Sequence, residues 1–293
     1  MKNILILLSS LRRAVYLSLI ILVWIHQTGF SQEIQNLDSL ELSFRAEKYD
    51  KSDRLMILNK LAREHEDNNK KILYSTELID ISVEMDSIDK QFDGYIARGH
   101  AQITKGEFSV ALEDYFEASK IAGQTGDEEQ EAIVNLAIAG GYSRLSNNEK
   151  ALEYYKYALS FFRTKETDNF PTLNTGYTLF NIGEQYLFLS KPDSAMLYFN
   201  QANPIFKEHR DQMGQAYAAG SKGKAYSMLG QNELALKNLK EAVDALMELD
   251  NFFEAISEYQ LAISHIYLDQ GELESAETYA QLSLNTGEKY DLK

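Results

Sequence analysis

The sequence has no cysteine, only 3 prolines and a single tryptophan among its 293 residues. Without cysteine the chain can form no disulfide, offers no thiol nucleophile, and has no residue to which a lipoprotein's acyl anchor could be attached. The scarcity of proline removes the residue that most often breaks a helix. Together these absences favour a long helical protein that folds without covalent cross-links.

Positive charge is scarce as well, because the chain carries 29 lysines and arginines against 44 aspartates and glutamates. Three of the basic residues, Lys2, Arg12 and Arg13, fall within residues 1–31, which contain no acid. The remainder therefore has 26 basic and 44 acidic residues, a formal net charge of −18. A surface so acidic repels phosphate backbones, and we therefore expect no nucleic-acid partner.

The first 31 residues have the layout of a secretory signal peptide. Basic residues precede an apolar run over residues 14–25, and Gly29 and Ser31 form a small-x-small pattern before Gln32. We expect cleavage before Gln32 and export to the periplasm or the medium. The alternative is a retained anchor at residues 14–25, although this run is shorter than the roughly 20 residues that span a bilayer. Only in that case would the chain contact a membrane.

Residues 176–204 contain two helical patterns separated by a turn. The second pattern begins after the turn at Pro192 and repeats Ala195, Phe199 and Ala202 at helical spacing. Small residues let two antiparallel helices cross closely, and large residues fill the space around the crossing. The first pattern places apolar residues and one glycine on a single helix face: Leu179, Ile182, Gly183, Tyr186 and Leu189.

The same pattern recurs along the chain. Aligning each turn on the residue that opens the second helix gives intervals of 39, 40, 44, 40 and 41 residues between successive positions. These positions are Ile72, Ala111, Ala151, Ala195, Ala235 and Ala276. A sustained period of this length indicates a repeat architecture, in which each helix pair buries its apolar face against the next pair.

This pattern resembles the tetratricopeptide (TPR) repeat, in a variant of about 40 residues similar to the sensing arrays of bacterial TPR-containing signalling proteins. The resemblance implies an all-α, right-handed superhelical solenoid of about six antiparallel helix pairs. We expect a leading helix, or N-terminal cap, at residues 32–51 and the solenoid at residues 52–293. No capping helix is expected after the sixth pair, so apolar groups at this end are predicted to be partly uncovered. We expect the sequence to be either a fragment of a longer protein or a chain that pairs with another molecule, such as a second copy, through this end.

Several local features carry further expectations. Gly106 is predicted to close its helix in a left-handed conformation, and Ser146 with Glu149 forms a capping-box pattern for the next second helix. The 44-residue interval predicts a longer loop between Thr164 and Thr172. Pro204 is expected to kink or end its helix.

We expect no catalytic residue, no metal ligand and no cofactor. The mature histidines are scattered, without the His-x3-His spacing of a metal site. Residues 220–225 faintly resemble a phosphate-binding loop, but Gly223 is explained as a helix-crossing glycine and Ala225 replaces the metal-binding hydroxyl. An enzyme is therefore the remote alternative.

The resemblance implies a groove, lined by the first helices of successive pairs, that binds a protein or an extended peptide. Adjacent Gly140 and Gly141 suggest close backbone approach by a ligand or a neighbouring helix. We expect a non-enzymatic, exported scaffold that serves as the sensing part of a signalling system, or alternatively a stand-alone periplasmic assembly factor. The predicted groove residues are His100, Gly140, Tyr177, Phe180, Glu184, Tyr217, Lys224 and His265.

Overall fold

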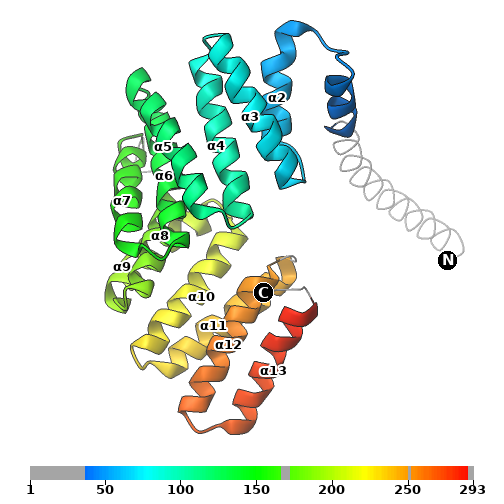
Figure 1. Ribbon diagram of the computed structural model, residues 1–293. Coiled ribbons are helices and arrows are strands. Elements are labelled where there is room, and N and C mark those ends of the chain that lie inside the picture. Colours follow the sequence, from blue (N-terminus) through cyan, green and yellow to red (C-terminus); the bar gives the residue numbers. More distant parts are fainter. Residues whose placement is uncertain (1–36, 166–171, 250–251, 290–293) are drawn as a thin grey trace, which may run out of the picture. The chain divides into compact units, whose positions relative to one another are not determined.

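The computed structural model describes residues 37–165, 172–249 and 252–289 (Figure 1). These residues form helices joined by short turns, and they contain no strand. The prediction of an all-α protein is therefore confirmed. The predicted signal peptide, residues 1–31, lies outside the described residues, as does most of the predicted loop between Thr164 and Thr172.

The chain divides between Gly106 and Glu107 into two compact units. The N-terminal unit contains helical residues 37–45, a short 3-10 helix at Lys51–Asp53, and the helices α2 (Arg54–Glu64), α3 (Asn68–Glu84) and α4 (Ile88–Thr104). The division falls inside the second predicted pair, whose helices α4 and α5 belong to different units.

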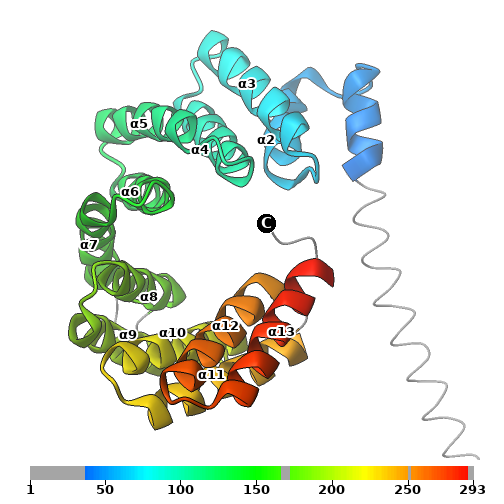
Figure 2. The same ribbon diagram turned by 60° about the horizontal axis from the view of Figure 1, so that its bottom comes forward.

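The C-terminal unit continues the alternation of first and second helices. Its helices are α5 (Phe108–Thr125), α6 (Glu128–Arg144), α7 (Asn148–Lys165), α8 (Leu173–Phe188), α9 (Pro192–Glu208), α10 (Gln212–Met228), α11 (Asn232–Leu249), α12 (Phe253–Asp269) and α13 (Leu273–Lys289). Each helix packs against the next one along the chain. Figure 2 shows α6 and α8 on one side of this unit, with α7 and α9 on the other side.

The small residues that set the repeat period are buried at the helix crossings. Ala111, Ala151, Ala195 and Ala235 are completely buried, and Ala276 is nearly so. At Gly183 an added Cβ would lie 2.4 Å from the ring of Phe199, so the two helices approach too closely for a side chain there. The predicted crossings and the TPR-like solenoid are confirmed, while the right-handed superhelical sense stays a prediction.

In the last five pairs, the turn between the two helices contains one residue in the left-handed conformation. Gly106 has a φ of +80°, as predicted. Ser146 occupies the same kind of position with a φ of +57°, and the side chain of Asn147 accepts a hydrogen bond from the backbone N–H of Lys150. The predicted capping role of Ser146 is therefore wrong, because its backbone forms the turn and Asn147 supplies the cap.

Helix α9 runs through Pro204 to Glu208. Of the two predicted effects of Pro204, an end of the helix is wrong, and a kink stays a prediction. Pro204 and Asn200, whose carbonyl would otherwise accept the missing hydrogen bond, are both exposed, so solvent can satisfy that carbonyl.

Candidate functional site

The first helices of the last three pairs lie next to one another. Helix α8 contacts α10, and α10 contacts α12. Side-chain caps fix where two of them begin: Thr172 accepts a hydrogen bond from the N–H of Thr175, and Asp211 accepts one from the N–H of Gly214. The three helices therefore present one continuous row of side chains.

Lys224 of α10 forms ion pairs with residues of both neighbouring first helices. Its Nζ lies 3.3 Å from Oε2 of Glu184 on α8 and 2.9 Å from Oε1 of Glu258 on α12. The side chains of Lys224 and Glu184 are 20% and 18% exposed, whereas that of Glu258 is 56% exposed. Burial alone would lower the pKa of Lys224, but the two carboxylates outweigh it and raise this pKa above its usual value.

Two half-buried aromatic rings continue the row. The ring centroids of Phe180 and Tyr217 are 6.2 Å apart, and Tyr217 meets Phe252 edge-on at 6.1 Å. Burial raises the pKa of the Tyr217 hydroxyl, and the carboxylates of Glu254 and Glu258 raise it further. We call the set of Phe180, Glu184, Tyr217, Lys224 and Glu258 the inner row.

The inner row also contains an acceptor without a donor. Oε1 of Glu184 is buried and has no hydrogen-bond partner among the described residues, and the same holds for Oε1 of its neighbour Gln185. A buried acceptor that lacks a donor costs free energy. An N–H group of a bound partner, or solvent, would satisfy the Glu184 oxygen, whereas the Gln185 amide donates to Ser143 of α6. The row can thus hold donors, cations and apolar side chains.

Four of the predicted groove residues are brought together in this row: Phe180, Glu184, Tyr217 and Lys224. Tyr177 instead makes an internal contact, because its hydroxyl donates to Asp211 at 2.5 Å and its ring packs on Phe206. His265 is an exposed residue of α12. His100 belongs to the N-terminal unit.

The adjacent glycines of α6 differ from each other. A Cβ on Gly141 would lie 2.7 Å from Leu112 of α5, so a neighbouring helix does approach closely there. A Cβ on Gly140 would come no closer than 4.0 Å to another side chain, the hydroxyl of Tyr155. The predicted close approach of a neighbouring helix is therefore confirmed at Gly141 and is not found at Gly140, where approach by a ligand stays a prediction.

The sequence did not indicate Glu258. The predicted groove residue of α12 is His265, which directly follows the crossing residue Ser264. The long side chain of Lys224 instead reaches a residue nearly two turns before the crossing. Only the packing of α10 on α12 shows this partner.

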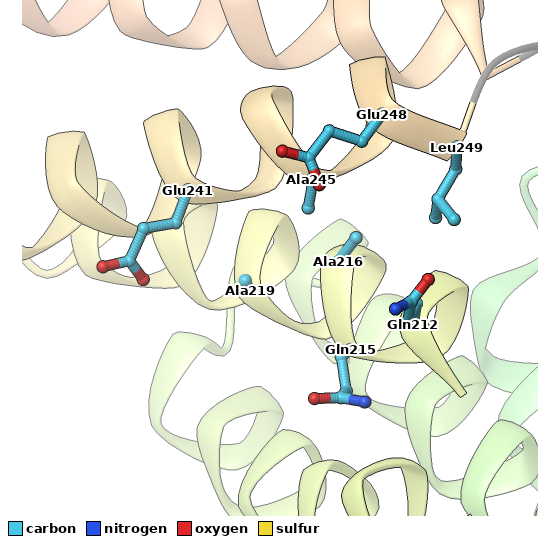
Figure 3. Close-up of a pocket in the computed structure, with 8 residues that line it drawn as sticks. All are labelled: Gln212, Gln215, Ala216, Ala219, Glu241, Ala245, Glu248 and Leu249. Carbon is cyan, nitrogen blue, oxygen red and sulfur yellow. The ribbon is translucent and has the colours of Figure 1, made fainter. Parts of the chain in front are cut away.

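A second feature that the sequence did not indicate is a cavity of about 340 Å³ between α10 and α11 (Figure 3). It lies on a different face of α10 from Tyr217 and Lys224. Alanines and Leu249 form its apolar part, while the carboxylates of Glu241 and Glu248 come from α11. The lining residues are Gln212, Gln215, Ala216, Ala219, Glu241, Ala245, Glu248 and Leu249.

The residues that resembled a phosphate-binding loop are part of α10. A Cβ on Gly220 would lie 2.2 Å from the ring of Tyr259, and one on Gly223 would lie 2.6 Å from Leu239. Both glycines therefore serve helix packing. Over the described ranges, no three histidine, aspartate or glutamate side chains gather in a way that could hold a metal ion. None of the described helices is long and apolar enough to cross a membrane.

Comparison with known proteins places this architecture among TPR-like arrays. No protein-family model matches the chain. Over 149 residues, 51% of the chain, it is 24% identical to the regulatory protein RapG of Bacillus subtilis (strain 168). Over 106 residues it is 28% identical to a kinesin light chain-related protein of Arabidopsis thaliana. These matches cover 40% and 16% of the two relatives, so the chain spans less than half the length of each.

Solved structures also support a TPR-like fold. The apo form of RapI superposes with a TM-score of 0.70 at 17% identity, covering 91% of this chain and 97% of RapI. A Rap protein complexed with competence and sporulation factor gives a TM-score of 0.62 at 17% identity, covering 89% of this chain and 78% of that one. The chain is a TPR-like repeat protein that resembles the Rap and NprR regulators and the kinesin light chain arrays.

Proposed function

We propose that the chain is a non-catalytic TPR array that binds a peptide or an extended protein segment in signalling, and that the inner row is its contact surface. The observation that carries this proposal is the Glu184–Lys224–Glu258 arrangement across three successive helices. Half-buried aromatic rings flank it. Such a mixture of partly exposed rings and charges is typical of interface hot spots.

The spacing of the helices suits an extended ligand. Packed helices lie about 8–10 Å apart, and an extended peptide advances roughly 3.3 Å per residue. About every third residue of such a peptide would therefore meet the next helix. A segment of roughly six residues would be long enough to contact α8, α10 and α12 in turn.

The charges of the inner row indicate which peptides would bind. Two carboxylates face one ammonium group, so the row carries an excess negative charge. Glu258 is more than half exposed and can accept a second cation. We therefore expect peptides that combine a lysine or arginine with an aromatic or aliphatic side chain about three residues away.

Similar folds support a peptide as the ligand. The comparable Rap structure was solved with competence and sporulation factor, and a comparable NprR structure was solved with its cognate peptide NprX. The similarity to these structures is a similarity of fold at 17% identity. The identity of the peptide must therefore be found by experiment.

A peptide library displayed on phage tests the proposal. We expect selection on the purified chain to enrich short sequences with one basic and one large apolar residue. Selection on the Glu258→Gln variant should lose the basic residue from the enriched sequences. If no sequence is enriched over an unselected library, or if the enriched set is the same for both proteins, the inner row is not the contact surface.

A further inference from the structure

The N-terminal unit has a small cavity where α2 and α4 end and α3 begins. It has a volume of about 140 Å³, which is below the range of roughly 300–1,000 Å³ for sites that hold drug-sized ligands. It therefore has room for a small ion and not for a nucleotide. Its lining residues are Ala62, Arg63, Lys71, Ala97, His100, Ala101 and Thr104.

Basic side chains from three helices line this cavity, and no acid does. Arg63 comes from α2, Lys71 from α3 and His100 from α4. No carboxylate of the described chain lies within ion-pair distance of Arg63 or Lys71. Other basic residues of the unit do have such partners, as Arg54 and Lys90 show.

Three small apolar residues also line the cavity. Ala62, Ala97 and Ala101 are almost fully buried. The only other polar lining residue, Thr104, already donates its hydroxyl to the carbonyl of His100. Arg63 and His100 are exposed and Lys71 is partly buried. Two permanent positive charges that line one small cavity attract an anion by Coulomb's law.

We propose that the Arg63–Lys71–His100 cavity binds a phosphate-type dianion. Arginine matches the geometry of phosphate oxygens with two parallel donors, lysine adds a point charge, and imidazole can donate one N–H. Two permanent charges balance a dianion better than a carboxylate. This site is separate from the inner row and does not rest on the peptide-binding proposal.

The electrostatic surroundings of His100 agree with this assignment. Burial lowers the pKa of its imidazole, and the nearby charges of Arg63 and Lys71 lower it further. The positive potential that disfavours a proton on His100 is the potential that attracts an anion. In a chain with a formal net charge of −15, such a positive site is unusual.

Calorimetric titration of the purified chain with inorganic phosphate at low ionic strength is the test. We expect saturable binding that Arg63→Gln or Lys71→Gln weakens by about tenfold or more, because each removes a charge-assisted contact. The matched control is Lys60→Gln, which removes one positive charge from α2 outside the cavity. It should change the affinity less than about twofold.

Further ligands identify the chemistry and the source of the anion. Acetate should bind much more weakly than phosphate; equal affinity would overturn the dianion assignment. Either order of affinity between O-phosphoserine and phosphate supports the site. Tighter binding of O-phosphoserine indicates a phosphate group carried by a partner protein, and tighter binding of phosphate indicates the free ion. Circular dichroism checks that each variant is folded. Absence of saturable phosphate binding, or an equal loss in Lys60→Gln, overturns the proposal.

Discussion

At the scale of single residues, Glu41 shows how a buried charge stabilises the N-terminal unit. Its carboxylate accepts hydrogen bonds from the hydroxyl of Tyr74 at 2.6 Å and the Nζ of Lys70 at 3.0 Å, and Nε2 of His65 lies 3.2 Å away. Arg45 pairs with it at 2.7 Å. Burial raises the pKa of Glu41, but these partners outweigh burial and lower it to about 2.

This depressed pKa predicts an acid-sensitive unit. The stabilisation by ionised Glu41 is complete above its ordinary pKa of 4.5 and is lost as the pH falls toward 2. Glu41→Gln should lower the free energy of unfolding at pH 7 by about 2 kcal/mol and flatten its dependence on pH below 4.5. Urea denaturation followed by circular dichroism at several pH values measures both effects.

Asp38→Asn is the control for this prediction, because Asp38 is an exposed residue of the same short helix. It should leave the unfolding curves nearly unchanged. An unchanged pH dependence in Glu41→Gln would contradict the role assigned to the buried carboxylate.

At the scale of helices, the fold depends on close crossings between the two helices of a pair. Phe199 is fully buried and its ring fills the space above Gly183. Gly140 instead stands one residue after the crossing position of its own helix, and a Cβ there would come no closer than 4.0 Å to another side chain. Alanine has a higher helix propensity than glycine at both positions, but only at Gly183 would its side chain clash with a neighbouring ring.

We predict opposite effects for alanine at these two positions. Gly183→Ala should destabilise the chain by about 1–3 kcal/mol, because the aromatic ring beside it cannot move without disturbing a packed core. Gly140→Ala should stabilise it by about 0.5–1 kcal/mol through helix propensity. Urea denaturation of both variants gives the comparison. The same sign of change in both would show that the crossings do not distinguish them.

The helix pairs were predictable because their packing repeats in the sequence every 40 residues or so. The turns were less predictable, because Ser146 and Ser190 adopt the left-handed conformation that glycine usually supplies. A serine before a helix looks like an N-cap, and only the backbone shows otherwise. The sequence left two outcomes open at Pro204, a kink or an end of the helix, because it does not show that an exposed face tolerates the lost hydrogen bond.

At the scale of the whole molecule, four residues of the candidate site could be predicted and one could not. The repeat predicts Glu184 and Lys224, which are one period apart, and the two aromatic residues Phe180 and Tyr217. Glu258 depends on how far a lysine side chain reaches across two packed helices, which no spacing in the sequence encodes. The cavity between α10 and α11 depends on packing in the same way.

Export is the first prediction for the whole chain. We propose that residues 1–31 are removed as a signal peptide, so that the mature protein begins at Gln32 and lacks Trp24, the only tryptophan. Its fluorescence should then come from tyrosine alone. Intact mass of the protein recovered from its cells decides the question, and a mass that includes Trp24 would favour the retained anchor.

Self-association through α13 is the second prediction for the whole chain. Leu282 and Leu284 are 42% and 53% exposed on this helix, and exposed apolar groups of this kind favour contact with another molecule. We expect sedimentation over a wide concentration range to show dimers that Leu282→Glu weakens. Leu42→Glu, at an exposed leucine of the N-terminal unit, is the control. A strict monomer at all concentrations would contradict this prediction.

The central claim is that a peptide binds along the inner row, and affinity measurements on matched variants test it most directly. The ligand is the most enriched peptide from the library, and its dissociation constant is measured by calorimetry. Glu258→Gln should weaken binding by about tenfold, as expected for loss of a charge-assisted contact. Asp269→Asn, which removes an exposed carboxylate from the end of the same helix, should change it less than about twofold. Equal affinities for the wild-type chain and Glu258→Gln would contradict the claim.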